Sequence, residues 1–335
     1  MKPDLSNEIY TKVVPSLDTI EIDSRYVDAK TVECERLSIN GKKLETIINE
    51  EKLQPSDLVG REIIGEDDYY VLWDNNGQPI DVKLPKGYCP SFERCNGLKT
   101  WKWDLAGVTN TSQMFQSCSN LESFEGDLND LVNGSNMFTY DAKMTSFKTT
   151  NLDKLDTARN MFFQNPITEF TYELPSLRIA SAMFQSTNLA LFDKNFPLLV
   201  NGEYMFFGCV TLTSFNAQTP LLEKGLHMFS GTKLVSFSGN LSSLQSGGGM
   251  FSYCRLDKPS VQNIINCLRT TNVLTTTATL DLGIDKTLAT DSELLEFLQI
   301  SEGVAQSITI VPPVRTLEDG TVVGGGTWTV NLTWN

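Results

Sequence analysis

The chain contains very little histidine and has a shortage of basic residues. Its 335 residues include one histidine, His227, so a pair of histidine ligands or a histidine relay cannot come from this chain alone. The 27 lysines and arginines are outnumbered by 41 aspartates and glutamates, which gives a net charge of −14 and a surface that repels phosphate backbones. We therefore expect no metal site, no cofactor and no nucleic-acid partner.

Long apolar segments and paired cysteine motifs are absent as well. The sequence has no run of roughly 18 apolar residues that could span a bilayer, and residues 1–20 lack the apolar core of an export signal. The seven cysteines contain no CxxC pair, which fits neither a zinc ribbon nor a dense disulfide framework. These absences predict a protein that is made in the cytoplasm, is not inserted in a membrane and has mostly buried thiols.

What the sequence does contain is an internal repeat built on the dipeptide Met-Phe. The pair recurs at steps of 22 to 24 residues, and a degenerate copy at Ser91-Phe92 makes eight copies between about 91 and 256. Since every copy supplies the same two positions, we interpret them as core residues and not as a cofactor site. These residues are Met114, Phe115, Met137, Phe138, Met161, Phe162, Met183, Phe184, Met205, Phe206, Met228, Phe229, Met250 and Phe251.

Further apolar and small residues keep fixed distances from each Met. An apolar residue follows after six or seven positions and an aromatic residue three positions later, as in Leu121 and Phe124. Three residues before the Met there is Gly or Ala from the third copy onward, whereas the second copy has Thr111. A small residue at this position would allow neighbouring copies to approach closely.

A unit of about 22 residues is too short to bury its own Met, Phe and Leu side chains, so the copies must stack and share one core. This predicts a repeat solenoid of short strands and turns, because units rich in Ser, Thr, Asn and Gly leave little room for a long helix. With neighbouring strands about 4.8 Å apart, the eight copies would form a rod on the order of 40 Å long.

The residues and their spacing resemble the bacterial leucine-rich repeats of the BspA type, whose units have this length and a recurrent Met-Phe signature. The resemblance covers roughly half of the chain. It implies a leucine-rich-repeat-like fold and a binding scaffold, without implying a particular ligand.

The segments on either side of the repeat have different patterns. Residues 258–335 predict an α+β cap, with a helix entered through Pro259, a second helix capped by Asp291 and a last strand that includes Trp328. Residues 57–90 predict a small β-rich module with a hairpin turn at 74–77. Residues 1–56 are interpreted as an anchoring or oligomerising segment, which leaves 91–257 for the solenoid.

The candidate ligand-binding residues are polar residues that directly precede the repeated aromatic residue. On a repeat sheet they would form an outward-facing ladder that binds a glycan or a protein through many weak hydrogen bonds. The alternative is that they only solvate the sheet, and no catalytic residue is assigned. The ladder consists of Ser123, Ser146, Glu169, Ser214 and Ser236.

His227 and the repeated cysteines admit structural interpretations. His227 precedes a Met-Phe pair, at a position that other copies fill with Gln, Asn, Ala, Tyr or Gly, which is typical of a coil surface. Cys95, Cys118, Cys209 and Cys254 recur at one position of the unit and are expected to form a core ladder. Because Cys95 and Cys118 belong to adjacent copies, a disulfide between them is sterically feasible, and the sequence leaves their oxidation state open.

A short N-terminal stretch suggests where such a protein works. The INGKKL sequence at 39–44 is similar to the N-terminal attachment regions of phage fibre proteins. Together with the missing export signal, it predicts a non-enzymatic virion protein of a gut phage, a head or tail fibre or a decoration protein. Residues 1–90 would bind other virion proteins, and the solenoid would bind a host surface glycan or protein. A homo-oligomer is expected, with a trimer favoured.

Three alternatives remain open from the sequence. The chain could be a cell-surface adhesin of a commensal bacterium, a polysaccharide depolymerase with its site in the terminal modules, or an intracellular scaffold for a single protein partner.

Overall fold

The computed structural model describes the repeats, most of the C-terminal region and several short strands near the N-terminus. The described residues are 92–94, 99–101, 105, 107–271, 277–301, 303 and 306–335, together with strand segments between 20 and 85. The cysteines 34, 89 and 95 and the predicted turn at 74–77 lie outside the described residues.

The N-terminal strands form one hairpin and one four-stranded sheet. In the sheet, β4, β5 and β6 are antiparallel neighbours, and β1 lies parallel to β6 at the edge. A strand from the predicted anchoring segment thus joins the sheet of the predicted β-rich module. The strands are β1 (Ile20–Glu21), β2 (Ser38–Ile39), β3 (Lys42–Lys43), β4 (Arg61–Ile64), β5 (Asp67–Trp73) and β6 (Pro79–Pro85).

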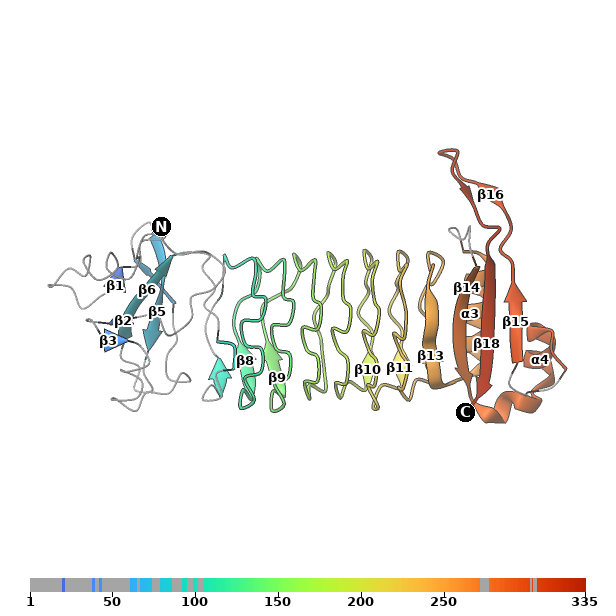
Figure 1. Ribbon diagram of the computed structural model, residues 1–335, viewed down its shortest axis with the longest axis horizontal. Helices are drawn as coiled ribbons and strands as arrows, with labels where there is room; N and C mark the ends of the chain where they lie inside the picture. Colours follow the sequence, from blue (N-terminus) through green and yellow to red (C-terminus); the bar gives the residue numbers. More distant parts are fainter. Residues whose placement is uncertain are drawn as a thin grey trace, which may run out of the picture.

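The repeats form coils that stack in a single row between the N-terminal strands and the C-terminal region (Figure 1). Backbone N–H groups donate to carbonyls of the next coil, as from Phe115 to Met137 at 3.0 Å and from Phe206 to Met228 at 2.9 Å. Because each coil satisfies backbone groups of its neighbour, the chain has a repeat fold. Parallel bridges link one position of successive coils, namely Asn110, Asn133, Thr157, Ile179, Asn201, Lys224 and Ser246.

Short strands on one side of the coils form two three-stranded parallel sheets. The coil that contains Phe170 lies between the two sheets and has no strand of its own. The first sheet consists of β7 (Thr100–Trp101), β8 (Ser123–Glu125) and β9 (Ser146–Lys148), and the second of β10 (Leu191–Phe192), β11 (Ser214–Phe215) and β12 (Ser236–Phe237). We call the outward side of these strands the strand face.

On a second side, each coil turns at two positions that have a positive φ. One is the residue before each Met, as in Ala182 (54°) and Tyr204 (57°), and the other lies three residues after the Met, as in Ser117 (63°). Left-handed backbone is unfavourable for residues other than glycine, at a cost of roughly 1 kcal/mol or more each. The hydrogen bonds between coils hold these residues in place. We call this side the Met-Phe face.

The core is built from two parallel stacks of aromatic rings. The Phe of each Met-Phe pair stacks on its equivalents, for example Phe206 on Phe229 with 5.6 Å between ring centroids. The aromatic residue of the strand side forms the second stack, and the stacks meet edge to face, as Phe215 and Phe229 do at 4.8 Å. All fourteen residues of the repeated Met-Phe pairs are at most 1% exposed.

The small residue three positions before each Met leaves space for the Met side chain of the next coil. A Cβ atom on Gly225 would come within 3.0 Å of the Met250 Sδ, and one on Gly134 within 3.1 Å of the Met161 Sδ. These glycines therefore allow the close approach that the sequence predicts. At the exceptional position, the hydroxyl of Thr111 contacts the Met137 Sδ at 3.0 Å.

The last coil leads into a four-stranded sheet that ends the row. Its strands lie in the order β13 (Gly247–Leu256), β14 (Thr277–Ile284), β18 (Thr327–Trp334) and β15 (Gln306–Ile310), of which only β15 is antiparallel to its neighbour. Trp328 and Val330 of β18 are buried in the same core as the repeats. The strand predicted to end the chain is therefore part of this sheet.

Two helices accompany the terminal sheet, where the sequence predicts them. Helix α3 (Lys258–Arg269) starts after the N-cap Asp257, whose carboxylate accepts from the Ser260 N–H at 2.9 Å. Helix α4 (Ser292–Leu298) is capped by Asp291 and follows the 3₁₀ helix η3 (Lys286–Thr290).

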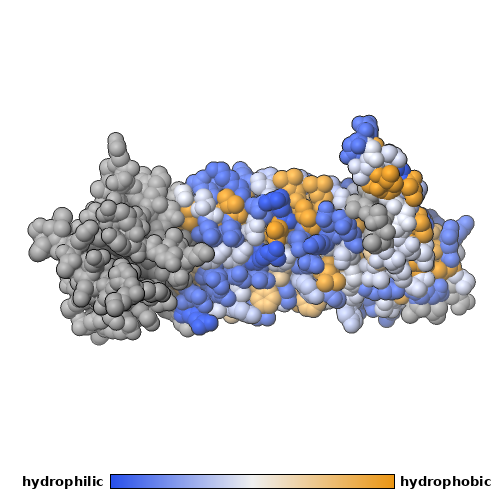
Figure 2. Space-filling model, turned by 45° about the horizontal axis from the view of Figure 1, so that its top comes forward, coloured by the Kyte–Doolittle hydropathy of each residue, from blue (hydrophilic) through white to orange (hydrophobic). Residues whose placement is uncertain are grey.

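A hairpin projects from this region between β15 and β18 (Figure 1). Strands β16 (Arg315–Thr316) and β17 (Val322–Val323) pair on either side of a turn at 318–320. Val311 and Val314 at its base are 61% and 67% exposed. Figure 2 shows hydrophobic residues at this base, next to a mainly hydrophilic surface over the repeats.

Candidate binding surface

The predicted ladder residues lie along the strand face. Register pairs Ser123 of β8 with Ser146 of β9, and Ser214 of β11 with Ser236 of β12. All four are partly exposed, while the aromatic residue that follows each one contributes to the core. The alternation of the strand therefore places these serines on the outward side.

The ladder is not continuous along the row. Glu169 is exposed but lies in the coil that has no strand, so it interrupts the line between β9 and β10. In the next coil the same position is occupied by Leu191, which is 61% exposed and pairs with Ser214. The structure thus brings together two serine pairs and separates them by a carboxylate and an exposed leucine.

Polar side chains next to the second serine pair bind one another across coils. The Asn216 Nδ2 donates to the Ser214 Oγ at 3.1 Å, and the Ser238 Oγ donates to the Asn216 Oδ1 at 3.3 Å. Gln218 donates to the carbonyl oxygen of Ser238 at 3.1 Å. Hydroxyl and amide groups thus run from coil to coil here, and both can donate and accept hydrogen bonds.

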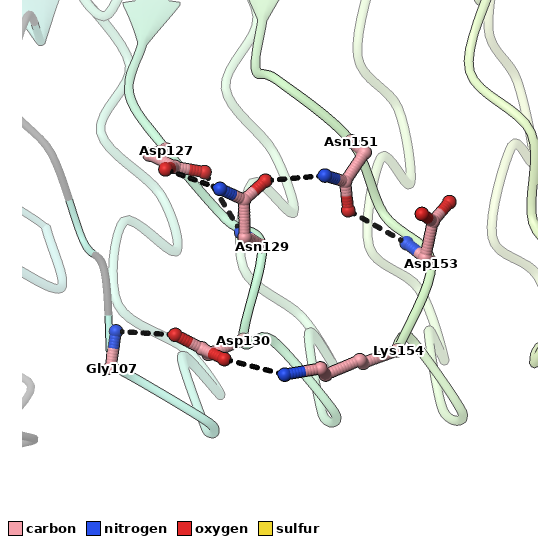
Figure 3. A network of polar contacts seen from close by, with 7 residues as sticks. All are labelled: Gly107, Asp127, Asn129, Asp130, Asn151, Asp153 and Lys154. Carbon is pink, nitrogen blue, oxygen red and sulfur yellow. Dashed lines mark hydrogen bonds and ion pairs between the residues drawn. The ribbon is translucent and has the colours of Figure 1, made fainter.

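A second polar network follows the turn after the strand face (Figure 3). The Asp127 Oδ1 accepts from the Asn129 backbone N–H at 3.0 Å, and the Asn129 Oδ1 accepts from the Asn151 Nδ2 of the next coil at 2.6 Å. The Asn151 Oδ1 in turn accepts from the Asp153 N–H at 3.2 Å. Asp127 and Asn151 therefore close the turns of their own coils, and the side chains of Asn129 and Asn151 bind each other between the coils.

Asp130 connects three successive coils in the same view (Figure 3). Its carboxylate accepts from the Gly107 N–H at 2.9 Å and from the Lys154 Nζ at 2.7 Å. Because the partners belong to the preceding and following coils, we interpret this network as a tie between coils and not as a ligand site.

His227 belongs to an aromatic cluster on the Met-Phe face that the sequence analysis did not identify. Its ring stacks on Tyr204 of the preceding coil at 5.2 Å, and Phe207 lies 5.8 Å from Tyr204 and 6.2 Å from His227. All three side chains are half-buried. The available signal was that Tyr204 and His227 occupy the same position in consecutive copies.

The repeated cysteine position is buried throughout the described coils. Cys118, Cys209 and Cys254 are fully buried, and burial raises the pKa of the Cys209 thiol to about 11 and that of Cys254 to about 12. Both thiols donate to a backbone carbonyl, Cys209 to Phe184 at 2.9 Å and Cys254 to Phe229 at 3.3 Å.

Asp141 occupies the same position as these cysteines in the third copy. It is fully buried, and neither carboxyl oxygen has a hydrogen-bond partner among the described residues. Burial raises the pKa of Asp141 to about 8, and the nearby Cys118 backbone offsets this only in part. In other copies the position is held by Thr187 and Thr232, whose hydroxyls donate to backbone carbonyls at 2.9 and 2.8 Å.

No helix in the described ranges is both long and apolar enough to cross a membrane. Among the same residues, no group of three or more His, Cys, Asp or Glu side chains is placed to hold a metal ion.

The stacked coils and their shared core define a repeat protein whose polar faces run along the stack. The family described as BspA type leucine rich repeat region matches residues 88–190 and 158–271, in 6 copies. These ranges together cover more than half of the sequence, so the chain belongs to the BspA-type leucine-rich repeat family. No curated protein and no solved structure matches the chain.

Proposed function

We propose that this chain is a non-enzymatic binding protein, a solenoid whose strand face recognises a glycan or a protein on a host cell surface. The observation that carries the proposal is the strand face itself, where two pairs of serines, Ser123 with Ser146 and Ser214 with Ser236, occupy the same position of adjacent coils in parallel register. A repeated surface offers many weak hydrogen bonds over an extended area, which suits a large surface ligand better than a small substrate.

We further propose that the particle which displays this solenoid is a phage virion. The support is the resemblance of the INGKKL stretch at 39–44 to fibre attachment regions. In this proposal residues 1–90 bind other virion proteins, and the chain is a head or tail fibre or a decoration protein. A homo-oligomer, with a trimer favoured, would multiply the weak sites of the strand face into a tight attachment.

The virion proposal is tested by finding out whether the chain is a component of phage particles. Particles are purified by density gradient from a culture that carries this sequence, and quantitative mass spectrometry measures its copy number relative to the capsid protein. A constant stoichiometric ratio supports the virion proposal. Recovery of the chain only with bacterial envelopes overturns it and supports a bacterial adhesin.

The strand face is tested by substitution. In the double variant Ser214→Arg and Ser236→Arg, two long charged side chains cover one serine pair, and we expect adhesion of the labelled protein to host cells to fall. Ser112→Arg is the matched control, because Ser112 is an exposed serine on the Met-Phe face. Equal adhesion of the double variant and the control would refute a role of the strand face.

A further inference from the structure

One row of outward-facing residues runs along the Met-Phe face and continues across the terminal sheet. Tyr204 and His227 occupy the same position in consecutive coils, and Gly249 takes that position in β13. The row continues across the terminal sheet, where Asp281 of β14 pairs with Asn331 of β18, and Asn331 pairs with Ser307 of β15. Figure 1 shows these strands side by side at the end of the stack.

At the aromatic end of this row, the His227 ring lies over Gly249, the first residue of the row that belongs to the terminal sheet. A Cβ atom on Gly249 would come within 2.2 Å of the His227 Nδ1, so the imidazole occupies the space that a side chain would fill there. Within the described residues, this buried Nδ1 has no hydrogen-bond partner. Tyr204 stacks behind the imidazole with an angle of 29° between the ring planes. The result is a partly exposed pair of aromatic rings directly beside a glycine.

The polar end of the row is held in a fixed geometry. The Asp281 Oδ2 accepts from the Gly249 N–H at 2.5 Å, and the Asp281 Oδ1 accepts from the Asn331 Nδ2 at 2.8 Å. Leu280 and Leu282 on either side of Asp281 are fully buried, so the carboxylate lies on the outward face of the sheet. These bonds leave one lone pair on each carboxylate oxygen of Asp281 available for a further hydrogen bond. They also leave available the amide oxygen and the second amide N–H of Asn331.

From this juxtaposition we propose that the row from Tyr204 to Ser307 is a binding site for a neutral oligosaccharide. The apolar face of a sugar ring packs on the aromatic pair, and the hydroxyls of the next sugar bind Asp281 and Asn331. Six neighbouring positions at a spacing of about 4.8 Å give a row roughly 24 Å long, which accommodates a chain of several sugar units. Thr279, Thr329 and Thr309 pair in a second row beside it and supply further hydroxyls.

The charge of the site favours a neutral ligand over an acidic one. Asp281 lies in the row, Glu203 directly precedes Tyr204, and the whole chain has a net charge of −14. Uronate or sialate groups would be repelled at this surface. The site lies on a different face from the serine ladder, so it goes beyond the proposed function and does not depend on it.

The test uses affinity electrophoresis of the full chain through native gels that contain yeast mannan, galactomannan, xylan or laminarin. A gel with polygalacturonate is the acidic comparison. The variants Tyr204→Asn and His227→Asn remove the aromatic pair, and the same position is already asparagine in two other coils, at Asn136 and Asn160. Asn331→Thr removes the amide while keeping a strand-compatible residue.

The control for general stickiness is Tyr140→Ser. Tyr140 is 46% exposed on the Met-Phe face, outside the row, and the equivalent residue of two other coils is serine. We expect at least one neutral gel to retain the unmodified chain. In that gel, the affinity of each row variant should be reduced about tenfold or more. Retention of the control should equal that of the unmodified chain.

Three results would overturn the proposal. They are retention in none of the neutral gels, retention only in polygalacturonate, and retention that the row variants leave unchanged. The Ser214→Arg and Ser236→Arg double variant is run in parallel. Its retention should be normal whether or not the strand face mediates adhesion to cells, so a failure of one proposal is distinguishable from a failure of the other.

Discussion

Replacing the buried Asp141 by threonine should make the protein more stable, and increasingly so as the pH rises. Asp141 has no hydrogen-bond partner for its carboxyl oxygens among the described residues, whereas Thr187 at the equivalent position donates to the carbonyl oxygen of Phe184 at 2.9 Å. The Asp141→Thr variant can make the same bond to Phe138, which lies three residues earlier. The substitution therefore exchanges a poorly solvated acid for a side chain that this fold already accepts.

The magnitude follows from the pKa of Asp141, which burial raises from 3.8 to about 8. Between these two values the folded chain holds a proton that the unfolded chain has released, so the free energy of unfolding falls as the pH rises. The slope is about 1.4 kcal/mol per pH unit, and from pH 4 to pH 7 the loss amounts to about 4 kcal/mol. Well below pH 3.8 the acid is protonated in both states and the penalty disappears.

The assay is urea unfolding followed by circular dichroism at pH 4, 5.5, 7 and 8.5, for the parent chain and for Asp141→Thr. Other carboxylates contribute equally to both proteins, so the difference between their unfolding free energies isolates Asp141. We expect this difference to grow with pH, and the reverse variant Thr187→Asp to introduce a second loss of the same sign. A difference that is constant across the four pH values would refute the reasoning.

Three further predictions concern packing, capping and reactivity. Gly225→Val should lower the free energy of unfolding by about 1–3 kcal/mol, because even a Cβ atom there lies 3.0 Å from the Met250 Sδ, while Gly225→Ala should cost less, as urea unfolding can show. Asp257→Ala should destabilise by about 1 kcal/mol through loss of the α3 N-cap, and Asp257→Asn should restore most of it in thermal unfolding. Cys209 and Cys254 should resist iodoacetamide at pH 8 in the folded chain and react in urea, because burial raises both thiol pKa values to about 11 and about 12; mass spectrometry that found rapid labelling of the native chain would contradict this.

The repeat and its core were predictable because the same pattern of apolar residues recurs in every copy. The spacing of the Met-Phe pairs identifies the buried positions directly, and the small residue at Gly134 or Gly225 indicates the close approach of the next coil. The coil corners were not predictable in the same way. Ala182 and Tyr204 adopt a positive φ that neither residue favours, and only the hydrogen bonds between coils impose it.

The candidate sites, too, were predictable where they follow from the repeat and unpredictable where they depend on the local path of the chain. The serines of the strand face follow from strand alternation, but the missing strand around Glu169 depends on the local path of one coil. The row at the end of the stack could not be predicted, because Tyr204, Asp281 and Asn331 lie far apart in the sequence. They come together only when the terminal strands add to the last coil in the order β13, β14, β18 and β15.

The repeated backbone pairing also makes the length of this protein adjustable. Around its Met-Phe pair, every coil from Met114 to Met228 donates the same backbone N–H groups to the next coil, so one whole unit can be gained or lost without changing either end of the stack. Each such event would move the terminal sheet by about 4.8 Å relative to the first coil. The number of copies therefore sets the distance between the first coil and the terminal sheet in fixed steps, while the residues at both ends of the stack stay the same.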